Sequence, residues 1–245
     1  IFRLRRVSIS HSKDEWIMTS ISERLQAVRA CIDAAAISAG RDPQQVHLLA
    51  VSKAHPATAI REAFAAGQRR FGENYLQEAL DKQMQLGDLA IEWHFIGPIQ
   101  SNKTQPIARH FDWAHSVDRL KIAQRLSMAR PDHLPPLQIC LQVNVSKEET
   151  KSGMAAEEAA ELAHAVSALP HLQLRGLMAI PAPTNDVDLQ RAQFRQVREL
   201  FESLQQQGLM LDTLSIGMSD DYPAAIAEGS TMVRIGSAIF GPRNP

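Results

Sequence analysis

Short apolar segments of strand-like composition alternate with amphipathic helical segments along most of this 245-residue chain, and this alternation limits the fold more than any other feature. Eight strand segments can be counted, at residues 46–52, 69–75, 91–97, 112–117, 137–145, 174–180, 213–217 and 232–236. Strands that alternate with helices form a parallel sheet covered by helices, and eight such units close into a barrel. Because no proline- or glycine-rich linker interrupts the pattern, we predict a single (β/α)8 barrel, an α/β fold. An open doubly wound sheet is the alternative, but its dinucleotide signature, G-x-G-x-x-G, does not follow the first strand segment.

The start of the chain differs from the rest. Residues 1–17 begin with a basic, partly apolar stretch and continue with polar residues, without the apolar core of a signal peptide. We therefore expect a disordered or non-native extension, with Met18 as the natural start. Ser20 and Glu23 have the spacing of a capping box, and apolar residues then recur at helical intervals. The predicted barrel domain, residues 18–245, thus begins with an extra helix that precedes the first strand.

Composition and charge exclude several classes of partner. The net charge of −1 and the pI near 6.8 give no overall field that would attract nucleic acid or an anionic membrane. No apolar run has the length of a membrane span. Cys31 and Cys140 stand far apart, which is typical of buried thiols in a reducing compartment, so we expect a cytoplasmic protein. His55, His94 and His115 lack the spacing of metal ligands, and no metal site is predicted.

The first strand segment, residues 46–52, is followed directly by Lys53, and it has apolar side chains on both faces. In a barrel the carboxyl ends of all strands meet at one mouth, where ligands bind. Partial desolvation there lowers the pKa of a lysine and makes the neutral amine a nucleophile towards an aldehyde. The alternative is an ordinary strand-end lysine whose ammonium group lies in water.

The last two strand segments each end in a glycine next to hydroxyl groups, at residues 215–219 and 234–237. Glycine lets backbone N–H groups approach an anion, and barrels often bind phosphate at the loops that follow strands seven and eight. We expect these turns to face Lys53 across the mouth. A lysine that reacts with aldehydes and a pair of turns that bind phosphate together indicate a phosphorylated aldehyde as the ligand. The alternative is that the glycines only satisfy the geometry of a turn.

Six segments in one consistent order resemble the pyridoxal phosphate homeostasis family, the single-domain relatives of the alanine racemase barrel. They are residues 50–53, 71–75, 93–103, 175–180, 214–221 and 233–241. The resemblance covers roughly residues 18–245. It implies a fold-type III barrel that binds pyridoxal 5′-phosphate as a Schiff base on Lys53.

The same resemblance implies a role for each site residue. Arg234 matches the arginine beside the pyridine nitrogen, and Asn74 matches a residue near the cofactor ring. The residues that match phosphate contacts, or lie in the same turns, are Ser215, Gly217, Met218, Ser219, Gly236 and Ser237. A guanidinium is always charged and keeps the ring nitrogen unprotonated, which weakens carbanion chemistry. Arg234 as a structural ion-pair residue is the alternative.

Lys151 is a second lysine that the barrel would bring to the mouth, in the loop that follows the fifth strand segment. It could accept the aldehyde during transfer to an apoenzyme. The alternative is an exposed loop lysine.

Racemisation needs two bases on opposite faces of the substrate. In the related racemases the second base is a tyrosine from a following domain, whereas Tyr75 and Tyr222 here do not stand in a matching context. The resemblance therefore implies a carrier or buffer of pyridoxal phosphate without established turnover, with transient contacts to apoenzymes. A racemase of low activity, or a Schiff-base aldolase, is the alternative. Because the strand-exit loops are short, we expect a monomer.

Overall fold

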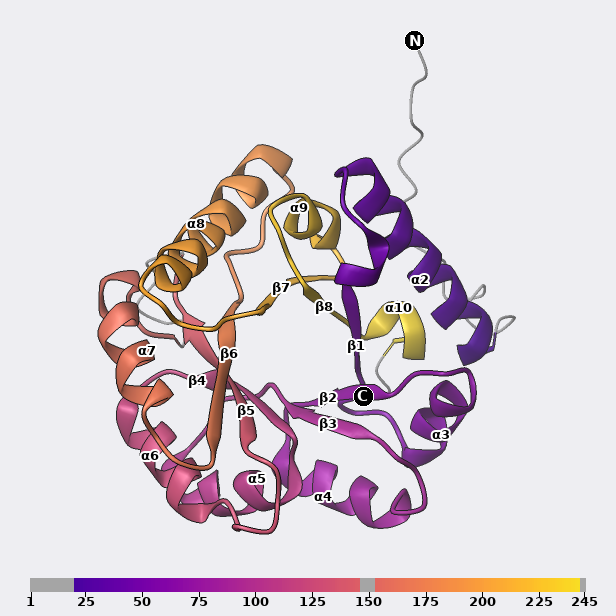
Figure 1. Cartoon of the computed structure of the whole chain (residues 1–245). Coiled ribbons are helices and arrows are strands. Elements are labelled where there is room, and N and C mark those ends of the chain that lie inside the picture. The colour runs from indigo at the N-terminus through magenta and orange to yellow at the C-terminus, as the bar shows by residue number, and fades with distance from the viewer. Residues whose placement is uncertain (1–19, 146–152, 243–245) are drawn as a thin grey trace.

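Eight parallel strands form a closed barrel in the computed structural model, which describes residues 20–145 and 153–242 (Figure 1). The strands are β1 (His47–Val51), β2 (Arg70–Glu73), β3 (Glu92–Phe95), β4 (Trp113–Val117), β5 (Leu137–Val143), β6 (Leu172–Ala179), β7 (Thr213–Met218) and β8 (Met232–Ile235). Each strand pairs with the next, and β1 also pairs with β8, so that Ala50 lies opposite both Phe71 and Ile235. The predicted barrel is confirmed, and the open sheet is excluded.

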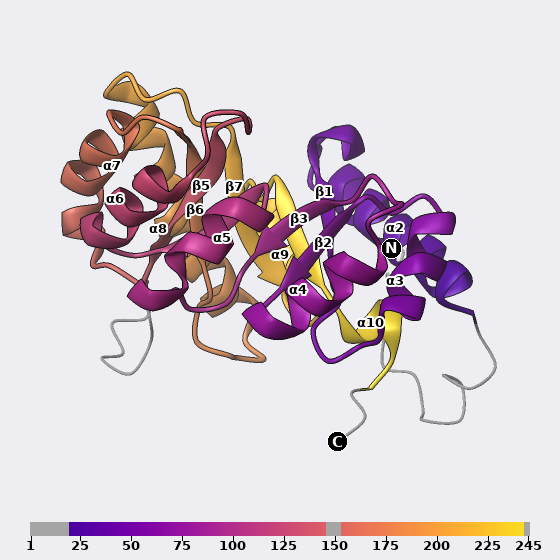
Figure 2. The same ribbon diagram turned by 90° about the horizontal axis from the view of Figure 1, so that it is seen from below.

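Helices surround the barrel on its outside, as the two views in Figures 1 and 2 show. They are α2 (Ile21–Ser38), α3 (Ala57–Ala65), α4 (Leu76–Gln85), α5 (Thr104–His110), α6 (Leu120–Ala129), α7 (Ala159–Ser167), α8 (Val187–Gln206), α9 (Tyr222–Ala227) and α10 (Ser237–Phe240). Short 3-10 turns, η1 (Pro43–Gln45), η2 (Ser101–Lys103) and η3 (Ala156–Glu158), precede β1, α5 and α7.

The extra N-terminal helix is α2, as predicted. The Ser20 hydroxyl accepts a hydrogen bond from the Glu23 N–H, and the Ser20 N–H donates to the Glu23 carboxylate, which completes the capping box. Its buried face packs against α3, α9 and α10, so α2 covers the side of the barrel where β8 meets β1. The expectation for residues 1–17 lies outside the described residues.

Two local features could not be read from the pattern of the sequence. The helix α6 begins at Leu120 without a side-chain cap, and the Asp118 carboxylate bonds the Arg119 guanidinium. The short helix α10 was not predicted; it follows Gly236 and lies below the barrel in Figure 2.

The barrel interior is not uniformly apolar. Leu48 to Val51 are buried on both faces of β1, as expected for a parallel strand. The buried residues also include His94, His115, Ser215 and Arg234 from β3, β4, β7 and β8. In the described part of the chain, no helix is long and apolar enough to cross a membrane.

Candidate functional site at the barrel mouth

The strands that carry the predicted site residues are neighbours in the barrel. β7 pairs with β8, β8 with β1, and β1 with β2, so their carboxyl ends form one continuous arc of the mouth. A Cβ atom on Gly236 would lie only 3.0 Å from the carbonyl oxygen of Val51. The turns after β7 and β8 were expected to face Lys53 across the mouth. That placement is wrong for β8, which lies directly beside β1 because the barrel closes there.

Lys53 is half-buried in a turn that begins directly after β1. Ala54 adopts φ of 61°, an unusual left-handed conformation for a residue with a side chain. Its N–H donates to the Glu78 carboxylate at 2.7 Å. On the other side of Lys53, the Ser52 N–H donates to the Gly72 carbonyl and the Ser52 hydroxyl to Glu73. Both neighbours of Lys53 are thus held by groups from β2 and α4.

A buried ion cluster of Glu73, Glu78 and Lys82 supplies these contacts. The Lys82 ammonium group donates to Glu73 and to the Ser52 carbonyl, each at 2.8 Å, and also pairs with Glu78. Burial raises the pKa of Glu73 above its ordinary value, although the charge of Lys82 and the hydrogen bonds from Lys82 and Ser52 oppose the shift. Sequence analysis missed this cluster, since Glu78 and Lys82 have the i, i+4 spacing of an ordinary surface pair.

Arg234 is buried below the mouth and holds β6, β7 and β8 together. Its guanidinium donates to the carbonyl and the hydroxyl of Ser215 and, at 2.9 Å, to the carbonyl of Ala179. Burial lowers the pKa of Arg234 to about 10, with Asp221 opposing, so the group stays charged at neutral pH. A fixed positive charge therefore lies just below the mouth, among β6, β7 and β8.

The turn after β7 needs glycine at position 217. Gly217 has φ of 94°, and a Cβ atom there would lie 2.6 Å from the Cβ of Ala225 on α9. The Met218 N–H donates to the Asp221 carboxylate at 2.6 Å, which closes the turn around half-buried Ser219. These contacts hold the backbone of this turn against α9. On the next turn, Ser237 is exposed at the start of α10.

Asn74 follows β2 and carries a polar atom without a protein partner. Its side-chain oxygen is buried and accepts no hydrogen bond from the residues that the structure describes. The chain just after β3 approaches the backbone of Asn74 closely, and only glycine fits there. A Cβ atom on Gly97 would lie 2.2 Å from the Asn74 carbonyl oxygen. A buried acceptor of this kind is usually satisfied by protein, water or ligand.

The two tyrosines considered as a second base lie in different surroundings. Tyr75 is 57% exposed, at the start of α4. Tyr222 is buried below Gly217 on α9, and burial, together with the neighbouring Cys31 thiol, raises its pKa to about 12. Tyr222 is therefore a poor proton acceptor at neutral pH.

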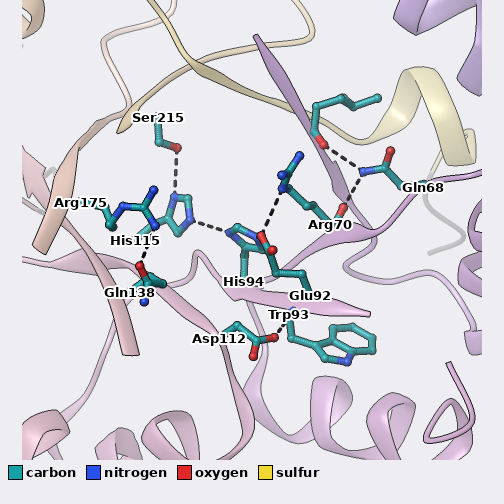
Figure 3. A network of polar contacts seen from close by, with 11 residues as sticks. Gln68, Arg70, Glu92, Trp93, His94, Asp112, His115, Gln138, Arg175 and Ser215 are labelled. Atoms are coloured by element: carbon teal, nitrogen blue, oxygen red, sulfur yellow. Dashed lines mark hydrogen bonds and ion pairs between the residues drawn. The ribbon is translucent and has the colours of Figure 1, made fainter. Parts of the chain in front are cut away.

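Histidines that sequence analysis assigned to ordinary strand positions take part in a buried network (Figure 3). His94 bonds Glu92 and His115, and His115 bonds Ser215. Alternation along a strand puts Glu92 and His94 on the same face, and this spacing is the sequence signal that could have indicated the network. His55 lies in the Lys53 turn with its ring against Phe240. Among residues 20–145 and 153–242, no three metal-ligating side chains form a cluster.

A cleft of about 920 Å³ opens at the opposite end of the barrel, among the first residues of the strands. Arg70, Glu92 and Arg175 contribute to its wall. It lies away from the mouth and contains none of the predicted cofactor residues. Lys151, the second lysine of the sequence analysis, lies outside the described residues.

Comparison with known proteins was made on sequence and on structure. A family model described as "Alanine racemase, N-terminal domain" matches residues 24–244. The pyridoxal phosphate homeostasis protein of Pseudomonas aeruginosa is 63% identical over 227 residues, which cover 93% of this chain and 97% of that protein. The Escherichia coli K12 protein of the same name is 55% identical over 230 residues, with 93% and 98% covered.

Among solved structures, PipY of Synechococcus elongatus with pyridoxal phosphate bound superposes with a TM-score of 0.80 at 42% identity. The match covers 91% of this chain and all of PipY. Alanine racemase of Corynebacterium glutamicum gives a TM-score of 0.64 at 21% identity, over 90% of this chain and 62% of that enzyme. At this identity the racemase shares the fold, and nothing further follows from the match.

Proposed function

Since the chain belongs to the pyridoxal phosphate homeostasis protein family, we propose that it binds pyridoxal 5′-phosphate on Lys53 and acts as a carrier or buffer of this cofactor. The observation that carries the proposal is the arc of adjacent strand ends, which gathers Lys53, a buried arginine and two glycine turns. Pyridoxal phosphate supplies an aldehyde, which forms a C=N bond with a neutral amine and releases one water molecule.

The residues of the mouth fit the chemistry of this cofactor. The buried oxygen of Asn74 is an acceptor left without a protein donor in the described residues, beside the Lys53 turn. Gly217 and Gly236 let their turns pack closely against Ala225 and Val51, where a side chain would collide. Glycine turns of this kind can offer backbone N–H groups to an anion. We propose that Ser219, Gly236 and Ser237 hold the phosphate, with Ser215, Gly217 and Met218 shaping the same turn.

Arg234 defines the chemistry that the site favours. Its buried guanidinium keeps its charge at neutral pH, and we propose that it faces the ring nitrogen. A charged donor there opposes protonation of the ring, so the site binds the cofactor without strengthening it as an electron sink. The surroundings of Tyr222 support the same conclusion, since burial raises its pKa to about 12 and keeps it protonated at neutral pH, while Tyr75 is largely exposed to solvent.

Partners and location follow from this role. We propose transient contacts with apoenzymes that receive the cofactor, a monomeric state, and a cytoplasmic location. The location is supported by Cys31 and Cys140, which are both free thiols. We keep Lys151 as a candidate acceptor of the aldehyde during transfer.

Deuterium exchange separates the carrier from a racemase. Holo-protein is incubated with L-alanine in deuterated water, and α-deuteration is followed by mass spectrometry, with free pyridoxal phosphate and the Lys53→Ala variant as controls. We expect no D-alanine, since racemisation needs a second base, and deuteration no faster than with free cofactor, since an unprotonated ring is a weak electron sink. Exchange well above that rate together with formation of D-alanine, both lost in Lys53→Ala, would support the racemase instead.

A further inference from the structure

A continuous line of hydrogen bonds crosses the barrel interior from the end opposite the mouth to Arg234. It consists of Glu92, His94, His115 and Ser215, which we call the interior relay (Figure 3). The three links measure 2.8, 2.9 and 3.0 Å in that order. His94, His115 and Ser215 are fully buried. Glu92 lines the cleft at the end opposite the mouth and pairs there with Arg70. The relay thus joins the two ends of the barrel.

The donors and acceptors fix the direction of these hydrogen bonds. An ionised Glu92 carboxylate can only accept, so Nε2 of His94 donates to it, and Nδ1 of a neutral His94 is left to accept. Nε2 of His115 therefore donates to Nδ1 of His94, which leaves Nδ1 of a neutral His115 to accept from the Ser215 hydroxyl. A guanidinium can only donate, so the Ser215 oxygen accepts from Arg234 at 2.9 Å.

Electrostatics favour the same assignment. Burial lowers the pKa of His94, and it lowers that of His115 well below the ordinary value, with the charge of Arg234 acting in the same direction. Both imidazoles are therefore neutral at pH 7. Burial raises the pKa of Glu92, but the hydrogen bond from His94 and the charge of Arg70 outweigh it, so the carboxylate stays ionised. The reverse direction would need a protonated Glu92 or a charged imidazole.

We propose that Glu92, His94 and His115 are positioning residues for Arg234, because they orient the Ser215 hydroxyl so that its oxygen is left to accept from the guanidinium. This inference rests on the proposed function, in which Arg234 contacts the cofactor ring. Loss of the His115 acceptor leaves the Ser215 proton without this partner, so the hydroxyl is no longer held in the orientation in which its oxygen accepts best from Arg234. The guanidinium then loses one of the contacts that hold it beside Ser215.

The aromatic ring between the histidines supplies a matched control. Trp113 stacks on His94 with ring centroids 5.2 Å apart and lies 5.6 Å from His115, yet it makes no link of the relay in the described structure. Trp113→Phe therefore disturbs the same packing as His115→Phe while leaving every hydrogen bond of the relay. His115→Gln is the conservative variant, since its amide can accept from Ser215 and donate to His94.

The test uses the full chain with and without pyridoxal phosphate. In the apo-protein, ¹⁵N shifts of the His94 and His115 rings, assigned with the two His115 variants, should show neutral Nε2–H tautomers. In the holo-protein, His115→Phe should weaken cofactor binding about tenfold, the effect of one charged hydrogen bond, and shift the visible absorption band. His115→Gln should restore both, and Trp113→Phe should leave both unchanged.

Each outcome decides between the alternatives. Nδ1–H tautomers or a charged ring in the apo-protein would overturn the direction of the relay, whatever the cofactor does. If His115→Phe binds as the wild type does, or if Trp113→Phe has an equal effect, the positioning role is refuted while the proposed function stands. If the wild-type chain itself binds no pyridoxal phosphate, the proposed function fails, and the positioning of Arg234 for the cofactor fails with it.

Discussion

Replacement of Lys82 by methionine tests the buried ion cluster beside the Lys53 turn. The substitution keeps most of the side-chain volume and removes the charge that faces Glu73, whose side chain is fully buried. Glu73 would keep only the hydrogen bond from Ser52, and one of its oxygens already has no partner in the described residues. Removal of one partner from a buried pair typically costs about 3–5 kcal/mol.

The ordinary pKa of a carboxyl group gives an upper bound for this cost. Rather than stay charged and unpaired, Glu73 can take up a proton on folding. For a carboxyl of ordinary pKa near 4.3, protonation costs about 3.7 kcal/mol at pH 7 and about 1 kcal/mol at pH 5. Loss of the Lys82 hydrogen bond to the Ser52 carbonyl adds about 1 kcal/mol at either pH. We therefore expect Lys82→Met to lose about 3–5 kcal/mol at pH 7 and about 2 kcal/mol at pH 5.

The sign follows from proton linkage. Burial already raises the pKa of Glu73, and loss of the Lys82 charge raises it further in the folded variant, so the folded state binds an extra proton and stability is lost as the pH rises from the unfolded pKa to the folded pKa. Urea unfolding of wild type and variant at the two pH values measures the difference. The double variant Glu73→Gln/Lys82→Met lacks both fully buried charges of the cluster, keeps the partly exposed Glu78, and should lose about 1–2 kcal/mol at both.

An exposed pair serves as the control. Arg61 and Asp88 form an ion pair at 2.6 Å with both side chains largely in solvent, so Arg61→Met should change the unfolding free energy little at either pH. Equal costs of Lys82→Met at pH 5 and pH 7 would refute the reasoning, because the loss would then come from packing and not from the charge of Glu73.

Two further predictions concern single residues of the barrel. Gly217→Ala should cost about 2–3 kcal/mol and weaken cofactor binding, because alanine is strained at φ of 94° and its Cβ would overlap Ala225; Gly208→Ala, at φ of 91° with open space around it, should show only the smaller backbone cost. Thermal melts and a cofactor titration measure both, and equal effects at the two glycines would contradict a role for the β7 turn. Burial raises the pKa of Cys140 to about 12, so the unfolded state releases its thiol proton first, and the unfolding free energy should fall by up to about 1.4 kcal/mol per pH unit above pH 8.5. Cys140→Ala should remove this part of the alkaline slope, and an unchanged slope would contradict the burial of the thiol.

The alternation of apolar strand segments with amphipathic helical segments predicted most of the fold. Strands with apolar side chains on both faces are buried in a parallel sheet that helices cover. Lys53 and the turn at Gly217 could be recognised since both directly follow an apolar strand. The neighbours of Lys53 could not be recognised in this way. Lys82 has the spacing of a surface residue, and only the approach of α4 to the end of β1 buries it.

The interior relay shows a second limit of sequence analysis. His94 and His115 are 21 residues apart, and His115 and Ser215 are 100 apart. Their contacts depend on barrel closure, which brings side chains from β3, β4 and β7 to one interior. The sequence indicates that Glu92 and His94 share a face of their strand, but not which strand lies across from it.

Trapping the cofactor on its lysine tests the central claim most directly. Holo-protein is reduced with borohydride, which converts a C=N bond to a stable amine, and digested for mass spectrometry. We predict a pyridoxyl phosphate adduct on Lys53 alone, and loss of both the adduct and the visible absorption band in Lys53→Ala. An adduct of the wild type on another lysine, or a band that persists in Lys53→Ala, would contradict the assignment of Lys53 as the residue that holds the cofactor.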